Sequence, residues 1–408
     1  MKNSLILLIA LLLALGLGIV ASITQNTALL SIAKWIEPIG TIWIGFLKMT
    51  MLPLVISLLI TSVSSTRQTN SAPILKRTLL VFLSLYVVAI IAAIMLMPLI
   101  MHLLPASASV PANLIDTTTI SGEKPLSFLE QIVNWVPINP FKSAAEGAIL
   151  PLVIFSIMFG LALNHIAEEP KRVVTLFFQG VSEVMLKIVE WVLLIVPIGI
   201  FCVVFPLASQ MGINLVGALG FYVAVSVALS VVCILIVSVI ASFYTKTSLL
   251  SFMSACLQPQ FVALGTQSSL ATLPSMVEAA EEKLHIPSHV TSMVLPLAVA
   301  VFKVGSGIAA ITYIFFAARM YRIELTFSQI LITFIVAIAT AVGGAGLPSG
   351  ASFFAPIVTI FMAVGLPVEI IPVLFAVDTI PDMGVTTANV TADMAATSMV
   401  AKNTEDIT

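Results

Sequence analysis

The chain has 408 residues, of which 60% are hydrophobic and only 9% are charged. A soluble domain carries about 25% charged residues, so this composition excludes a water-soluble protein and predicts one that lies in a lipid bilayer. The formal net charge of −2 gives no basis for nucleic-acid binding. The three cysteines have no metal or redox spacing, and we interpret them as reduced packing residues. No cofactor is expected.

The first apolar run follows Met1-Lys2-Asn3. At about 20 residues it is longer than a signal-peptide core, and it predicts a membrane-spanning helix. Six further runs are long enough to cross about 30 Å of hydrocarbon; they fall near 38–64, 78–104, 144–166, 186–208, 215–243 and 292–317. Two apolar but interrupted segments follow, at 326–371 and 372–401.

Orientation follows from the basic residues in short loops, which favour the cytoplasmic side. With the N-terminus inside, the cytoplasmic loops carry Lys2, Arg67, Lys76, Arg77, Lys171, Arg172, Lys246, Lys283 and Lys402. The outer loops carry Lys34, Lys124, Arg319 and Arg322. This bias predicts a multi-pass protein of the cell (inner or plasma) membrane with both termini cytoplasmic. The polar connection 106–125 is expected to be an outer surface loop without a site.

Two short stretches break the apolar pattern between half-length arms. They read PQFVALGTQSSLATLP at 259–274 and AVGGAGLPSG at 341–350. Unpaired backbone groups cost several kcal/mol each in hydrocarbon, so such breaks persist only where protein or a water-filled cavity satisfies them. They predict two re-entrant hairpins whose tips reach the middle of the membrane, as at the binding sites of transporters. The alternative is a pair of kinked helices whose small residues serve packing.

The segment 378–397 places polar residues at helical spacing. They are Asp378, Asp382, Thr386, Asn389, Asp393 and Thr397. Spacings of three and four predict one face of a single helix. Ionisable residues inside a span are expensive and indicate function, although a stripe that only binds neighbouring helices is the alternative.

A second buried charge is expected at Lys303, because apolar residues flank it on both sides. Gly305-Ser306-Gly307 follows and is expected to weaken the helix and free backbone carbonyls. A lysine in such a place must find a partner or lose its proton. The aspartates of the last span are the evident partners, either for ion coupling or as a purely structural strut.

The runs TQSSLATLP, GGAGLPSGA and VDTIPDMGVTTANVTADMAATSMVAK resemble the dicarboxylate/amino acid:cation symporters, the family of glutamate and neutral amino-acid transporters. The resemblance covers essentially the whole chain. It implies an all-α membrane protein with eight transmembrane helices and two re-entrant helical hairpins. It also implies a homotrimer of elevator-type transporters, each protomer with a static scaffold domain and a mobile transport domain.

By this resemblance, helices 1 and 2 of the scaffold occupy 1–76, helix 3 of the transport domain 77–105, and scaffold helices 4 and 5 106–210. The core of the transport domain would then occupy 211–408. Its parts after helix 6 are hairpin 1 at about 250–288, helix 7 at about 290–320, hairpin 2 at about 326–371 and helix 8 at about 372–403.

The resemblance also implies roles for single residues. Asp382 would hold a substrate amino group, Asn389 the α-carboxylate, and Asp393 would ligate sodium. The full predicted substrate site comprises Thr266, Gln267, Ser268, Ser269, Ser306, Gly346, Leu347, Pro348, Ser349, Gly350, Asp382, Val385, Thr386 and Asn389.

The chain departs from the family where relatives carry Asn-Met-Asp-Gly-Thr in helix 7. The residues here are Phe302, Lys303, Val304, Gly305 and Ser306. Phenylalanine and valine supply none of the oxygen ligands that hard cations need, so no metal ion is expected beyond any residual ligation by Asn389 and Asp393. We hypothesise that the Lys303 ammonium replaces a sodium ion and neutralises Asp393, and in addition Asp378. Transport would then be independent of sodium, and coupled to protons or uncoupled.

Relatives that carry acidic substrates hold the second carboxylate with an arginine at a position occupied here by Val385 or Gln267. An unpaired carboxylate in a dry pocket would cost several kcal/mol, so a small neutral amino acid is favoured. The alternatives are a sodium- or proton-coupled symporter of acidic amino acids or dicarboxylates, an anion-conducting channel-like relative, and a relative that does not transport.

An enzyme is not expected. The four histidines lie at predicted span ends, which leaves Ser349 without a base, and the aspartates share one predicted helix instead of facing each other.

Overall fold

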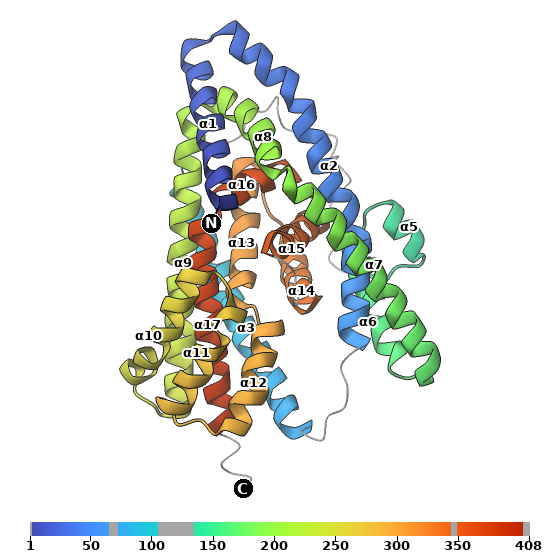
Figure 1. The fold of residues 1–408 in the computed structure, drawn as a ribbon, viewed down its shortest axis with the longest axis vertical. Helices are drawn as coiled ribbons and strands as arrows, with labels where there is room; N and C mark the ends of the chain where they lie inside the picture. Colours follow the sequence, from blue (N-terminus) through green and yellow to red (C-terminus); the bar gives the residue numbers. More distant parts are fainter. Residues whose placement is uncertain (1, 65–71, 105–132, 134, 344–348, 403–408) are drawn as a thin grey trace. The chain divides into compact units, whose positions relative to one another are not determined.

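The computed structural model describes residues 2–64, 72–104, 133, 135–343 and 349–402. Within those ranges the regular structure is helical (Figure 1). The first half contains α1 (Lys2–Thr24), α2 (Thr27–Ser64), α3 (Ala72–Met101), α5 (Pro140–Ala145), α6 (Ile149–Leu163), α7 (Glu168–Leu194), α8 (Val196–Met211) and α9 (Ile213–Thr245). The second half contains α10 (Leu249–Thr266), α11 (Ser269–Glu282), α12 (Ser288–Val301), α13 (Val304–Met320), α14 (Phe327–Gly343), α15 (Ser349–Val364), η3 (Val368–Ile370), α16 (Ile371–Val377) and α17 (Thr379–Lys402).

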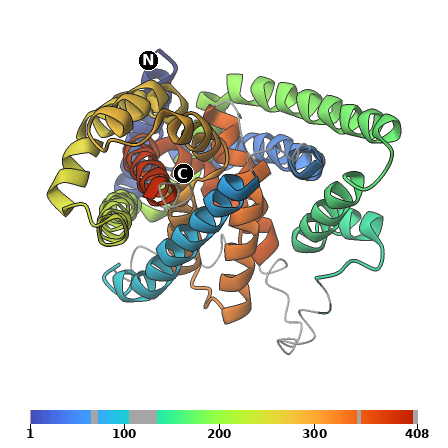
Figure 2. The same cartoon turned by 90° about the horizontal axis from the view of Figure 1, so that it is seen from below.

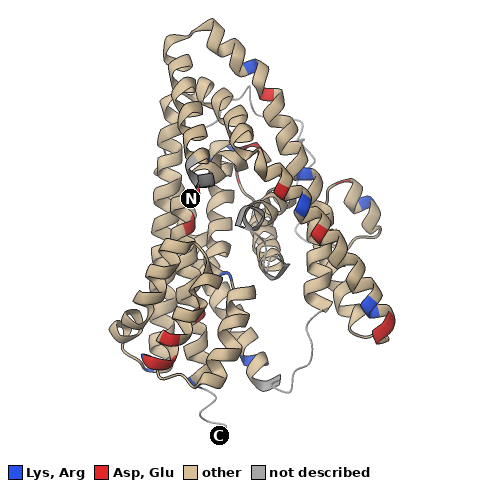
Figure 3. Ribbon diagram, in the orientation of Figure 1, with Lys and Arg blue, Asp and Glu red and all other residues tan. Residues whose placement is uncertain are grey.

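Six of the described helices are long and apolar enough to cross a membrane, or seven if α7 and α8 form one bent span. Figure 3 shows how few charged residues the helices carry. The protein is thus a multi-pass membrane protein, as its composition predicts.

Several predicted spans differ from the helices. The helix expected at 38–64 begins at Thr27, and the run at 144–166 divides into α5 and α6. The span expected at 186–208 is wrong as a single helix, because α7 ends at Leu194 and α8 leaves it at 61°. Pro197 lies in the first turn of α8. Since proline lacks an amide hydrogen and its ring clashes with the carbonyl four residues earlier, it kinks or ends a helix, and the chain bends here between α7 and α8.

Contacts divide the chain into two compact units. Unit 1 comprises Met1–Thr66, Ile100–Tyr222 and Tyr313–Asp378; unit 2 comprises Arg67–Leu99, Val223–Thr312 and Thr379–Thr408. In unit 1, α2 packs against α6, α7 and α8, and also against the hairpin formed by α14 and α15. The predicted division differs, because it assigns 326–371 to the transport domain. The assignment of segments to a static scaffold and a mobile transport domain therefore stays a prediction.

Unit 2 is built around α17. The hairpin of α10 and α11 packs against α17, as does α12 (Figure 2). Every residue from Val385 to Ala401 is buried, so the polar side chains of this helix must find partners within the protein or bind a ligand.

Candidate functional site

The tip of the first hairpin is a tight reversal between α10 and α11. Gln267 has a positive φ of 51° and ends α10, and its amide N–H donates to the carbonyl of Ala263. The Ser268 hydroxyl then accepts from the amide of Ala271 and caps α11. The predicted hairpin is confirmed here, with Thr266 exposed and Ser269 buried on its two arms.

The side chain of Gln267 joins this tip to the start of α17. Its Nε2 donates to the carbonyl oxygen of Thr379 at 2.9 Å. The first turn of α17 also carries Asp382. Thr386 lies one turn further along the same face of α17. The hairpin tip therefore lies at the end of α17 that carries Asp382 and Thr386.

Asn389 links α17 to a break in the neighbouring helical segment. α12 ends at Val301 and α13 begins at Val304, so the break expected near the glycines falls at Phe302 and Lys303. The first amide groups of a helix have no partner within it. The Oδ1 atom of Asn389 accepts one of them, from the Gly305 amide at 2.8 Å. A side chain at Gly305 would collide with the carbonyl oxygen of Val385, so glycine permits this close approach.

The carboxylate of Asp393 is the least satisfied group of the site. The side chain is fully buried, and neither Oδ1 nor Oδ2 has a hydrogen-bond partner. The Lys303 ammonium is the charge that acts on it, and Lys303 also interacts with Asp382. Among the described residues, however, no ion pair within 4.0 Å joins Lys303 to either acid. Lys303 is half-buried, and within the described part of the chain its ammonium forms no close ion pair with Asp382 or Asp393.

Apolar side chains occupy the two positions where the resemblance implies oxygen ligands for a cation. Phe302 is buried and stacks on Phe82 with ring centroids 4.3 Å apart. Val304 is fully buried. Neither side chain can bind a cation.

Asp378 belongs to a different setting from the rest of the predicted stripe. It lies between α16 and α17 and not on the last helix, so the single-helix prediction is wrong at this residue. Pro381 follows three residues later, and its ring disfavours a regular helix through this point because it clashes with the carbonyl four residues earlier. Within unit 1, the hydroxyls of Tyr222 and Tyr313 both donate to Asp378 Oδ1, at 3.1 Å and 2.9 Å.

The structure does not describe every residue of the predicted substrate site. Gly346, Leu347 and Pro348 lie outside the described residues, and Ser349 and Gly350 are described only as the first residues of α15. The predicted loop 106–125 also lies outside them. Ser306 is exposed, whereas Val385 is buried.

These contacts join a broken helix, a hairpin tip and a buried acidic helix, the arrangement that holds ions and small solutes in transporters. The family model of the sodium:dicarboxylate symporters matches residues 6–403. The chain belongs to the sodium:dicarboxylate symporter family. It is therefore a membrane transporter and not an enzyme.

Curated relatives have names of two kinds. A proton/sodium-glutamate symport protein of Bacillus subtilis is 29% identical over 91% of this chain and 87% of its own. The proton/glutamate-aspartate symporter of Escherichia coli is 27% identical over 91% and 86%. The human neutral amino acid transporter A is 33% identical over 62% of this chain and 48% of its own.

Sequence reasoning missed several polar residues that form hydrogen bonds with residues far along the chain. They are Lys48, Tyr222, Gln260 and Tyr313. Each lies in a largely apolar run, which gives no spacing pattern that would identify its partner. Gln260 illustrates the point, since its Nε2 donates to the hydroxyl of Thr391 on α17, far along the chain.

Proposed function

We propose that this protein is a secondary transporter that carries a small amino acid, with a neutral one favoured. The arrangement of Asn389 supports this most directly. Its Oδ1 accepts from Gly305, and its Nδ2 donates to no described residue, so the amide has hydrogens available for an α-carboxylate. Asp382 lies two turns earlier on α17 and would accept the substrate ammonium. The names of the relatives point to the same class of substrate.

We further propose that Lys303 replaces a sodium ion. Three observations support this: Phe302 and Val304 supply no oxygen, the Asp393 oxygens have no hydrogen-bond partner, and the Lys303 charge acts on Asp393. Transport would be independent of sodium, with a proton as the coupling ion if the lysine releases and regains one. The proton would travel with the substrate and is cargo.

The preference for a neutral substrate rests on two side chains. Val385 is buried and apolar, and Gln267 is engaged with the carbonyl of Thr379. Neither offers the fixed cation that a second carboxylate would need in a dry site. A symporter of acidic amino acids or dicarboxylates is the second candidate, favoured by the Lys303 ammonium and by the glutamate symporters among the relatives.

The mode of movement is proposed from the family resemblance. A homotrimer of elevator-type protomers would carry the substrate on the predicted transport domain, 77–105 and 211–408, with both termini cytoplasmic.

Uptake by proteoliposomes tests these proposals together. Radiolabelled alanine, serine, aspartate and succinate would be compared with sodium inside and outside, and with choline in its place, at two imposed pH gradients. We expect saturable uptake of a neutral amino acid that choline leaves unchanged. Strict dependence on sodium would contradict the role of Lys303. Exclusive uptake of aspartate or succinate would favour the second candidate, and flux without saturation would indicate a channel.

A further inference from the structure

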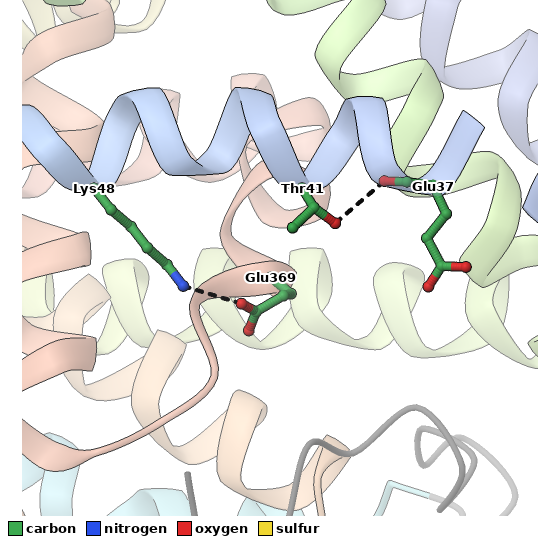
Figure 4. A network of polar contacts seen from close by, with 4 residues as sticks. All are labelled: Glu37, Thr41, Lys48 and Glu369. Carbon is green, nitrogen blue, oxygen red and sulfur yellow. Dashed lines mark hydrogen bonds and ion pairs between the residues drawn. The ribbon is translucent and has the colours of Figure 1, made fainter. Parts of the chain in front are cut away.

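An ion pair in unit 1 lies away from the candidate site. Lys48 is in the middle third of α2, which has 38 residues, and its Nζ is 3.1 Å from Oε1 of Glu369 in η3 (Figure 4). At a rise of about 1.5 Å per residue, Lys48 is more than about 20 Å from either end of the helix. Since α2 is long and apolar enough to span the membrane, Lys48 is a charge within a span, which indicates a functional role.

Glu369 follows the second hairpin directly. α15 ends at Val364, whose carbonyl accepts from Gln329 Nε2 on α14 at 2.8 Å. The hairpin and η3 both pack on α2. The ion pair therefore joins α2 to the segment that connects the hairpin with α16.

The pocket beside this pair is apolar apart from Lys48. Next to Lys48, a small pocket is lined by Ile44, Leu47, Phe354, Val358, Val368, Ile371 and Pro372. Trp43 of α2 also meets Phe354 of α15 edge to face, with ring centroids 6.1 Å apart. Apolar contacts are non-directional, so they tolerate displacement along α2. The ion pair is the contact here that specifies one register.

The strength of the pair depends on its surroundings. The two side chains are 41% and 53% exposed, so the pair is weak where water reaches it and stronger where water is excluded. Separating the two segments would leave both charges without this partner, so the pair opposes their separation.

We propose that Lys48 and Glu369 form a latch that holds the second hairpin against α2 in this conformation and opens during transport. This inference rests on the proposed function, because the predicted scaffold contains Lys48 and the predicted mobile domain contains Glu369. The ion pair would then be closed in one conformation of the transport cycle and open in another.

Cross-linking tests whether the two segments separate. In the variant with Lys48→Cys and Glu369→Cys, a bifunctional thiol reagent as long as the two original side chains would bridge the cysteines. The native cysteines are buried, and the two single variants control for them. We expect the cross-linked protein to retain amino-acid binding in a thermal-shift assay and to lose at least about 90% of uptake, with recovery after reductive cleavage. Full uptake by the cross-linked protein, or no cross-link at all, would overturn the latch.

Hydrogen exchange tests the latch without any transport assay. Glu369→Gln should raise the exchange rate of amides in 365–372 by about fivefold, and the swap of Lys48→Glu with Glu369→Lys should reverse most of this rise. Glu190→Gln is the matched control, because it breaks the exposed pair with Lys187 within α7, and it should leave 365–372 unchanged. Equal exchange in wild type and Glu369→Gln would overturn the latch. If the wild-type protein transports no amino acid but Glu369→Gln still raises exchange in 365–372, the proposed function is wrong, whereas the stabilising contact between Lys48 and Glu369 is supported.

Discussion

Two buried aspartates of the last segment have opposite surroundings. Asp378, in unit 1, accepts hydrogen bonds from Tyr222 and Tyr313 on one oxygen. Asp393, in unit 2, is fully buried and has no hydrogen-bond partner on either oxygen. The two tyrosines are themselves buried and stacked, with ring centroids 5.8 Å apart. Asp378 is thus fixed by hydrogen bonds from two tyrosines, whereas Asp393 has no hydrogen bond and can be stabilised only by a nearby charge or by a proton.

This difference separates a structural acid from a candidate coupling acid. Buried polar groups normally have partners, and an exception calls for an explanation such as an ion or a catalytic role. Charge-assisted hydrogen bonds stabilise Asp378 in place. Asp393 can instead bind a mobile cation or a proton, or interact with the Lys303 ammonium, without breaking any hydrogen bond.

The largest effect is expected when the charge facing Asp393 is removed. Asp393 is fully buried and has no hydrogen-bond partner, and an uncompensated buried charge costs about 3–5 kcal/mol, so Lys303→Met should lower uptake by about a hundredfold or more. Asp393→Asn should do the same, and combining the two should restore the melting temperature but not uptake. Uptake and thermal unfolding of the three variants test this.

Lys187→Met is the matched control, because Lys187 pairs with Glu190 on an exposed face of α7. It should leave uptake unchanged. If Lys303→Met carries substrate at the wild-type rate, the lysine is not part of the coupling site and Asp393 needs another explanation.

Substitution of Asp378 is expected to have a smaller effect on uptake and to lower mainly the stability of the fold. Asp378→Ala removes the carboxylate oxygen that accepts from both buried tyrosines, and losing a buried hydrogen-bond partner costs about 1–3 kcal/mol. Asp378→Asn retains an oxygen that can accept from both tyrosines, so it should unfold at nearly the wild-type temperature and keep the wild-type pH dependence of uptake. Thermal unfolding and pH-dependent uptake check both variants. A changed pH dependence in Asp378→Asn would show that both acids take part in coupling and would remove the contrast.

These contrasts show which parts of the fold the sequence could reveal. Apolar runs and helical spacing predicted the spans and the acidic face of α17, because burial in lipid imposes a pattern on every residue. The helix breaks were predicted less well. Pro197 and Pro381 cause two of them, and a proline inside an apolar run does not reveal whether its helix kinks or ends.

Long-range polar contacts were the part that spacing could not predict. The partners of Asp378 lie on α9 and α13, and the partner of Lys48 lies beyond the second hairpin. Nothing local in the sequence pairs such residues. The motif that carries the resemblance did name Gln267, Asp382 and Asn389, which the structure places at the hairpin tip and on α17; their roles at the site stay a prediction.

The bond between Asn389 and the broken helix depends on a close approach of that helix to α17. Gly305→Ala would place a methyl group against the carbonyl of Val385 and displace the Gly305 amide that Asn389 Oδ1 accepts. Overpacking of this kind costs about 1–3 kcal/mol, so the affinity for substrate should fall by about tenfold. Isothermal titration with the transported amino acid measures it. Gly180→Ala on α7, where the space is open, is the control. Unchanged affinity in Gly305→Ala would mean that Asn389 is not oriented by this bond.

The smallest expected effect is at the hairpin tip. Gln267→Ala removes a single hydrogen bond to the Thr379 carbonyl, and one such bond contributes about 0.5–1.5 kcal/mol. We expect a two- to tenfold loss of affinity, because the first turn of α17 then holds Asp382 less firmly. Gln267→Glu is the informative companion, since its length is the same but its carboxylate cannot donate to a carbonyl. It should lose at least as much affinity as alanine, and it should also repel an acidic substrate. If both variants bind the transported amino acid like wild type, the tip does not position Asp382, and substrate recognition would rest on α17 and the broken helix alone.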